Sequence, residues 1–209
     1  MTRAAGSRRL TLDDIADLRA YERERHEFRE RVIALKKRRR VPVGPLVTLT
    51  FENRDTMRFQ VQEMARAEKI LLDDAIQHEL DTYNALIPEP GTLSATLFVE
   101  LTSKEQLVEW LPRLVGIERS VEFVVGSGAG SAVVKAVPEE SHDEQLTRPD
   151  VTASVHYVRF ELSDELIERF AAETVVLAVN HEHYAEGATL GEDTKAELLA
   201  DLRRDVREG

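Results

Sequence analysis

The chain has 209 residues, of which 42% are hydrophobic and 32% are charged, so it is long and apolar enough to bury a substantial core. It contains no cysteine, which excludes disulfides, iron–sulfur ligation by this chain and a thiolate nucleophile. No window approaches the roughly 20 apolar residues that a membrane helix needs. The polar N-terminus does not resemble a secretory signal either. We therefore expect a cytoplasmic protein.

The net charge of −11 is distributed unevenly along the chain. Residues 1–40 carry 13 lysines and arginines against 7 acidic residues, whereas the rest of the chain is strongly acidic. A basic arm of this kind can bind nucleic acid or an anionic lipid surface. It can also fold back onto its own acidic body or onto a second subunit. We favour binding of the arm to the acidic body, either its own or that of a second subunit, because the body supplies the complementary charge. We do not expect nucleic-acid or membrane binding.

The first predicted element is a long helix over residues 12–39, within a basic N-terminal arm at 1–40. Thr11 is a suitable N-cap, and acidic residues in the first turn complement the helix dipole. An exposed apolar stripe would be unfavourable in water, so we expect the helix to pack on a partner and predict a homodimer. The stripe has three-four spacing and consists of Ile15, Leu18, Tyr21, Phe28, Val32 and Leu35.

Residues 41–209 are predicted to form a single α+β domain. Alternating apolar residues predict a strand over 46–52. The alternation at 57–61 predicts that this strand continues through a turn into a hairpin. The spacing of Met57, Val61 and Met64 also fits a helix over 56–70, which is the competing interpretation.

From residue 92 onward, strand and helix signals follow one another in the order of a ferredoxin-like antiparallel sheet, which we predict for residues 92–179. The Ser103/Gln106 pair forms a capping box, and Ser163 is the N-cap of a second helix. The glycine-rich segment 126–130 joins two short strands and lacks the Gly-Lys-Ser/Thr sequence of a phosphate loop. The remaining predictions are strands at 93–101, 121–125, 151–162 and 174–179, an inserted strand at 132–137, a surface loop at 138–149 and a final helix after Thr189.

The tripeptide His181-Glu182-His183 is the strongest chemical signal in the sequence. In an extended segment alternate residues share a side, so two imidazoles there can bind one metal ion, iron or zinc. His156 and Glu63 are the candidates for the further ligands that such a site requires. The ferredoxin-like order would separate His156 from His181 by about 20 Å along the sheet, so that topology and the three-histidine site exclude each other. The competing interpretation is a polar loop rim on which Tyr184 packs.

Glu63 has two interpretations of its own. An acid enclosed by the apolar residues around it, such as Phe59 and Val61, would have a raised pKa. We favour the simpler interpretation, a helix-surface carboxylate paired with Arg66.

Four sequence blocks together resemble the bacterial domain-of-unknown-function 3501 family: Leu46–Arg54, Phe59–Met64, Tyr83–Pro88 and Ser154–Tyr157. The resemblance extends from about Leu10 to Leu202. It implies no established activity. Members of the family look to be encoded beside rubrerythrin-like and iron–sulfur oxidoreductase proteins, which implies a redox or peroxide-stress role. We expect proline in place of Glu182 in many relatives, which argues against a catalytic role for Glu182.

These observations predict a non-enzymatic accessory protein of a redox or oxidative-stress system, with a rubrerythrin-like or iron–sulfur protein as its partner. The alternative is a metal-binding protein or an oxidoreductase. In that case iron or zinc would be held by His156, His181, His183 and Glu63.

Overall fold

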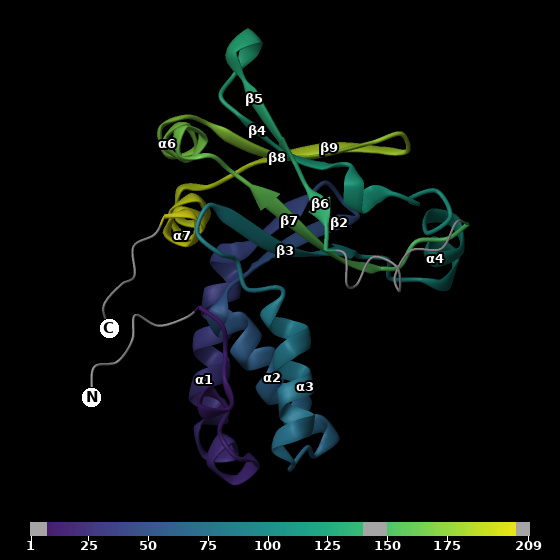
Figure 1. The fold of residues 1–209 in the computed structure, drawn as a ribbon. Helices are drawn as coiled ribbons and strands as arrows, with labels where there is room; N and C mark the ends of the chain where they lie inside the picture. Colours follow the sequence, from purple (N-terminus) through teal and green to yellow (C-terminus); the bar gives the residue numbers. More distant parts are fainter. Residues whose placement is uncertain (1–7, 140–149, 204–209) are drawn as a thin grey trace. The chain divides into compact units, whose positions relative to one another are not determined.

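The computed structural model describes residues 8–139 and 150–203 and shows the predicted α+β class, with helices and two antiparallel sheets (Figure 1). Most of the predicted loop at 138–149 lies outside the described residues. Within the described ranges, no helix is long and apolar enough to cross a membrane.

Two compact units make up the chain, and their boundaries differ from the predicted 1–40 and 41–209. The helical unit comprises Met1–Lys37 and Glu52–Glu89, and the sheet unit comprises Arg38–Phe51 and Pro90–Gly209. The difference arises because residues 57–61, predicted as the second strand of a hairpin, lie in a helix, and residues 52–89 group with the N-terminal helix.

The helical unit contains α1 (Leu18–Arg39, whose last two residues belong to the sheet unit), α2 (Arg54–Glu68) and α3 (Asp73–Asn84). The predicted helix at 12–39 begins later than expected. Thr11 opens only a short 3-10 helix, η1 (Leu12–Asp14). The carboxylate of Asp17 then accepts hydrogen bonds from the backbone N–H groups of Arg19 and Ala20, and so caps α1.

The predicted hairpin strand at 57–61 is wrong, and the competing helix is present as α2. Its N-terminus explains the outcome. The Asn53 side chain accepts from the Thr56 N–H at 3.0 Å, and the Thr56 hydroxyl accepts from the Asn53 N–H at 2.9 Å. This reciprocal cap satisfies two backbone donors and starts the helix directly after the preceding strand.

The apolar stripe of α1 is covered within the helical unit itself. Tyr21, Phe28 and Val32 are buried together, with Phe59 of α2 packed against them. The ring centroids of Phe28 and Phe59 lie 5.7 Å apart in an edge-to-face arrangement. The argument for a dimer through this stripe therefore loses its premise, and self-association stays a prediction.

The sheet unit holds two sheets. The first has the order β1 (Arg40–Val43), β2 (Val47–Glu52), β3 (Thr92–Val99), β7 (Val155–Glu161) and β6 (Val137–Pro138). The second has the order β5 (Ala132–Lys135), β4 (Val121–Val125), β8 (Val175–His181) and β9 (Tyr184–Thr189). The described part of this unit also contains the α-helices α4 (Lys104–Trp110), α6 (Asp164–Ala172) and α7 (Glu192–Leu202) (Figure 1).

The predicted ferredoxin-like sheet is not formed, because its four strands are divided between the two sheets. β3 pairs with β7, and β4 pairs with β8. The two sheets share one core, in which Phe123 of β4 lies 4.5 Å from Phe160 of β7 and 5.7 Å from Phe51 of β2, measured between ring centroids. The apolar face of an alternating strand can be buried equally well under a second sheet or under a helix. The alternation therefore did not distinguish two packed sheets from one sheet covered by helices.

Three arginines at the end of α1 and the start of β1 form ion pairs within the sheet unit. Arg38 donates to Glu197 of α7 at 2.7 Å, and Arg39 forms ion pairs with Glu197 and Asp201. Arg40 pairs with Glu100. These three arginines are therefore engaged by carboxylates of the sheet unit, to which they belong.

Candidate functional site

The tripeptide His181-Glu182-His183 lies at a hairpin turn and not in an extended segment. His181 is the register partner of Tyr184 at the end of the β8–β9 ladder, so Glu182 and His183 make the reversal. Nε2 of His181 lies 3.0 Å from the Val115 carbonyl oxygen, which can only accept, so this nitrogen is the donor. Nδ1 of His181 accepts from the His183 N–H at 3.2 Å. Both ring nitrogens of His181 are thus engaged by the backbone.

Tyr184 has the packing role expected of it, and its hydroxyl group adds a second role. The hydroxyl donates to the Val43 carbonyl at 2.6 Å and accepts from the Leu46 N–H at 3.1 Å, so it bridges the turn between β1 and β2. Gly44 in that turn has φ of +68°, and a Cβ there would lie 2.5 Å from the tyrosine oxygen. The hairpin that carries the histidines therefore holds a turn of the other sheet in place.

Glu63 is the partnered carboxylate that we favoured, but its partner is Arg25. Arg25 donates to both oxygens of Glu63 at 2.8 Å, and the Tyr21 hydroxyl donates to one of them at 2.6 Å. Arg66 pairs instead with Glu22. The hydrogen bonds from Arg25, helped by that from Tyr21, lower the pKa of Glu63 despite its partial burial.

His156 is the most buried of the predicted ligands, with only 2% of its surface exposed. Its Nε2 lies 2.8 Å from the Thr152 hydroxyl oxygen and 3.0 Å from the Ala153 carbonyl oxygen. Its Nδ1 lies 3.9 Å from Oε2 of Glu118, a carboxylate that is 1% exposed in the 3-10 helix η2 (Ile117–Arg119). Oε2 of Glu118 has no hydrogen-bond partner among the described residues.

Sequence reasoning missed Glu118 and Thr152. Glu118 follows a glycine and an isoleucine and precedes an arginine, which is an ordinary polar-turn composition. Its distance of 38 positions from His156 gives no local spacing signal. Only the pairing of β7 within the first sheet, and the turn at η2, bring the two side chains together.

Thr152, His156 and Glu118 have the order of hydroxyl, imidazole and carboxylate that nucleophilic triads use. The hydroxyl of such a triad must reach the carbonyl carbon of a substrate. Thr152 is only 3% exposed, so a substrate carbonyl cannot approach it in this conformation. The cluster therefore does not have the geometry of a hydrolase site.

The four residues predicted to bind a metal have separate surroundings. Glu63 is held by Arg25 and Tyr21 in the helical unit, whereas the three histidines belong to the sheet unit. Between residues 8 and 203, with 140–149 left aside, no group of three or more His, Asp or Glu side chains has the geometry to hold a metal ion.

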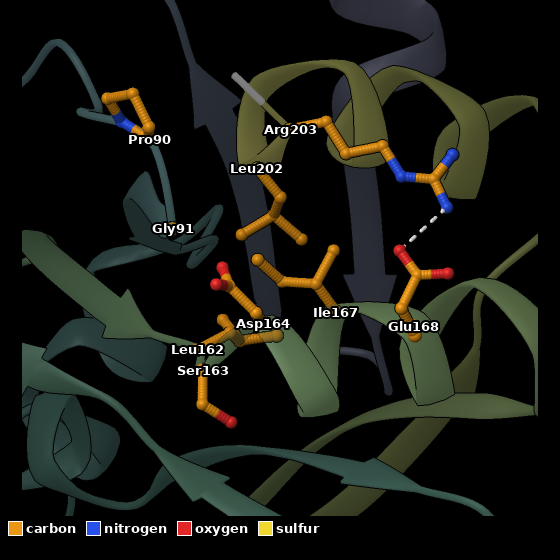
Figure 2. A pocket seen from close by; sticks show the side chains of 9 residues that line it. All are labelled: Pro90, Gly91, Leu162, Ser163, Asp164, Ile167, Glu168, Leu202 and Arg203. Carbon is orange, nitrogen blue, oxygen red and sulfur yellow. Dashed lines mark hydrogen bonds and ion pairs between the residues drawn. The ribbon is translucent and has the colours of Figure 1, made fainter. Parts of the chain in front are cut away.

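A surface pocket of about 610 Å³ lies beside the start of α6 and the end of α7 (Figure 2). Ser163, at its edge, caps α6 by accepting from the Leu166 N–H at 3.3 Å. Glu168 and Arg203 face each other across the rim at 3.4 Å (Figure 2). These polar groups therefore serve local structure. The apolar lining comes from Leu162, Ile167 and Leu202.

The fold and these sites define an α+β protein with a helical unit and a two-sheet unit. The chain matches the model of the family described as "Protein of unknown function (DUF3501)" over residues 9–202, and it belongs to that family. A crystal structure of a "novel protein of unknown function" from Burkholderia pseudomallei K96243 is similar to it, with 39% sequence identity and a TM-score of 0.83. That similarity covers 92% of this chain and 98% of the other. A search of curated proteins found no match.

Proposed function

We propose that this protein is a non-enzymatic accessory protein of the cytoplasm that binds a protein of a redox or oxidative-stress system. The proposal is supported by the roles of the side chains that looked chemical in sequence. Glu63 holds Arg25 and Tyr21, His181 holds the backbone of the 111–120 segment, and Arg39 holds α7. Each of these groups stabilises the scaffold.

The observation that carries the proposal is the exposure of two neighbouring leucines between α2 and α3. Leu71 is 75% exposed and Leu72 is 72% exposed, more than any other large apolar residue of the described chain. Lys69, with φ of +55°, ends α2 in the left-handed conformation and directs the chain outward ahead of the leucines.

A recess of about 570 Å³ adjoins this pair of leucines, and Leu71 forms part of its lining. Apolar side chains beside a concave surface with a charged rim are typical of protein–protein contact sites. The other lining residues all belong to the helical unit: Leu18, Glu22, Arg66, Ala67 and Lys69. We assign this surface, the leucine tip, as the docking site for the partner.

The redox character of the partner is supported by the family resemblance, which implies rubrerythrin-like or iron–sulfur oxidoreductase proteins as neighbours. The test uses purified full-length chain and purified proteins of these two classes from the same organism. Their affinity is measured by biolayer interferometry.

The informative variant is Leu71→Asp combined with Leu72→Asp. Losing contacts of this kind at the centre of an interface weakens binding by about tenfold or more. The matched control is Val108→Asp on α4, because Val108 is 69% exposed but lies in the sheet unit. The control should bind like the unmodified chain. If neither class of protein binds the unmodified chain, the proposed function is wrong. If the double leucine variant binds as tightly as Val108→Asp, the leucine tip is not the docking site.

A further inference from the structure

The outer edge of β9 is not explained by docking through the leucine tip. β9 is the last strand of the second sheet, and among the described strands it pairs with β8 alone (Figure 1). The Leu190 N–H donates to the Val175 carbonyl at 2.9 Å, which makes these two residues a hydrogen-bonded pair of the ladder. Hydrogen-bonded and non-hydrogen-bonded pairs alternate along antiparallel strands. The N–H and C=O groups of Ala185, Gly187 and Thr189 are therefore directed away from β8.

These backbone groups form a regular and open strand edge. Ala185, Gly187 and Thr189 are all exposed, and within residues 8–139 and 150–203 their N–H and C=O groups have no hydrogen-bond partner. The pairing of β9 with β8 continues without a bulge from Thr189 to Tyr184. A regular edge with open donors and acceptors is a template on which another strand can pair.

The other sheet edges in the described part of this unit are protected against strand addition. β1 contains Arg40 and Pro42, β5 has four residues including Lys135, and β6 has two residues including Pro138. Charged side chains, proline and short length are the usual means of protecting an edge. β9 has six residues, none of which is lysine, arginine or proline. It is therefore the edge on which a further strand fits.

The open edge of β9 is complementary to itself. When two copies pair antiparallel with Gly187 at the centre, Ala185 of each copy lies opposite Thr189 of the other, because both are two positions from Gly187. This is the only antiparallel register that pairs all three open residues, and each of the three pairs then forms two N–H···O bonds. The facing side chains are small, and a glycine inside a strand is typical of a place where another backbone approaches closely.

Glu186, the only charged residue of β9, favours the same register. Its side chain lies beside Gly44 of its own copy, in the turn between β1 and β2. With Gly187 at the centre, Glu186 lies opposite Ala188 of the other copy. A register centred on Glu186 would instead place two carboxylates directly opposite each other, which is destabilising, and would leave Thr189 beyond the paired strand. Charge and hydrogen bonding thus select one arrangement of two copies.

We propose that two copies of this chain associate through β9 and join their second sheets into one continuous sheet across a two-fold axis. The two-fold axis passes between the two Gly187 residues, so the contact is isologous and closes at a dimer. Pairing through one strand edge buries little surface, so this dimer belongs to the weak class of protein contacts. We expect a dissociation constant between about 1 µM and 1 mM.

Sedimentation velocity over a concentration series of the full-length chain measures the dimer, and Ala185→Pro is the informative variant. The Ala185 N–H points away from β8, so proline there removes a donor of the dimer contact but no bond of the monomer. The two-fold axis makes this loss occur twice, so the dissociation constant should rise about tenfold or more.

Val133→Pro on β5, the opposite edge of the same sheet, is the matched control. The Ala136 N–H donates to the Val121 carbonyl at 2.8 Å, so the alternation of the ladder directs the Val133 N–H away from β4. This variant makes the same chemical change at an edge that the proposed dimer does not use. It should dimerise like the unmodified chain.

A distance measurement tests the register without any proline variant. Because the chain contains no cysteine, Glu182→Cys at the exposed hairpin turn accepts a single nitroxide label. Position 182 is five positions from Gly187, so at about 3.4 Å per residue the two labelled positions of a dimer lie roughly 35 Å apart. Pulsed electron–electron double resonance should show a distance peak between about 30 and 40 Å.

Three outcomes overturn the proposal: a chain that stays monomeric up to about 1 mM, an Ala185→Pro variant that dimerises as well as Val133→Pro, and a label distance outside the expected range. If Ala185→Pro fails to fold, the label distance decides. The double variant Leu71→Asp, Leu72→Asp changes the helical unit, so it should dimerise like the unmodified chain. The dimer and the docking site can therefore fail independently.

Discussion

Each unit of the protein contains an arginine held by acidic side chains, and the two networks differ mainly in burial. Arg25 in the helical unit binds Glu63, with side-chain exposures of 29% and 27%. Arg39 in the sheet unit is only 1% exposed and binds Glu197, Asp201 and the carbonyl oxygen of Phe51. The chemistry of the two networks is the same, but water reaches both partners in the first, whereas in the second it reaches only the carboxylates of Glu197 and Asp201, which are 24% and 16% exposed.

The surroundings of an ion pair, and not its presence, therefore determine its energetic importance. Ion pairs in water-accessible places contribute little, because solvent screens them and side-chain entropy opposes them. A buried arginine is different, because solvent screens its interactions much less and its removal also leaves the buried carbonyl oxygen of Phe51 without this hydrogen bond. Both networks also account for sequence signals that looked functional: Glu63 as a metal ligand and the basic run as a binding arm.

The largest effect is expected from Arg39→Met. The substitution removes the buried charge and the hydrogen bond to Phe51, so we expect a loss of about 3 kcal/mol in the free energy of unfolding, measured with urea. Arg38→Met is the matched control, because Arg38 binds the same Glu197 but its side chain is 46% exposed. The control should lose no more than about 1 kcal/mol. Similar losses for both variants would contradict the importance of burial.

A smaller effect is expected from Tyr21→Phe, which removes one hydrogen bond to Glu63 and keeps the buried ring. The loss at neutral pH should be about 1.5–2 kcal/mol, the lower part of the range for a hydrogen bond to a charged group, because Glu63 is partly exposed. Burial, together with the bond to the Glu63 carboxylate, raises the pKa of Tyr21 well above its usual value near 10.

The raised pKa of Tyr21 determines how the stabilisation by its hydroxyl group changes at alkaline pH. The stabilisation is complete below about pH 10, where the unfolded tyrosine is still neutral, and it declines as the pH rises toward the folded pKa. The difference in unfolding free energy between the original chain and Tyr21→Phe should therefore shrink above about pH 10. A constant difference up to pH 12 would show that Tyr21 is not held in its neutral form.

Local signals predicted the local features of this fold well. The Ser103/Gln106 capping box and the Ser163 cap begin helices where expected, because these motifs depend on residues three positions apart. The glycine-rich tip at 126–130 likewise joins β4 and β5, with the Arg169 guanidinium donating to the Gly130 carbonyl at 2.7 Å.

The partition of strands between sheets could not be predicted in the same way. Alternation identifies the buried face of a strand but not the strand beside it, so β3–β7 and β4–β8 were placed in one sheet. β1 and β9 were missed because each is short or polar: β1 contains Pro42, and β9 has only one fully buried residue, Tyr184.

The Glu118–His156 pair depends on that tertiary arrangement, so no spacing in the sequence could indicate it. The buried Arg39 has the same origin. Its neighbours in the sequence are also basic, and only the position of α7 distinguishes it from them.

The smallest effect is expected from Glu63→Gln. This variant tests the partly exposed Arg25–Glu63 pair through the change of the unfolding free energy at acid pH. Hydrogen bonds from Arg25 and Tyr21 lower the pKa of Glu63 below its usual value. A lowered folded pKa contributes stability that is complete above the unfolded pKa of about 4.3 and is lost as the pH falls through the folded value.

Unfolding free energies of the original chain and of Glu63→Gln should therefore differ most at neutral pH and converge below about pH 4. At neutral pH the loss should be smaller than for Tyr21→Phe, because solvent screens the partly exposed carboxylate while glutamine can still accept from Tyr21. Glu27→Gln is the control, since Glu27 and Arg31 pair with each other on α1 and the Glu27 side chain is 80% exposed. This control should leave the pH dependence of the unfolding free energy unchanged. A Glu63→Gln variant that diverges further from the original chain below pH 4 would mean that protonation of Glu63 stabilises the fold. The carboxyl group would then behave as the enclosed acid of the rejected interpretation.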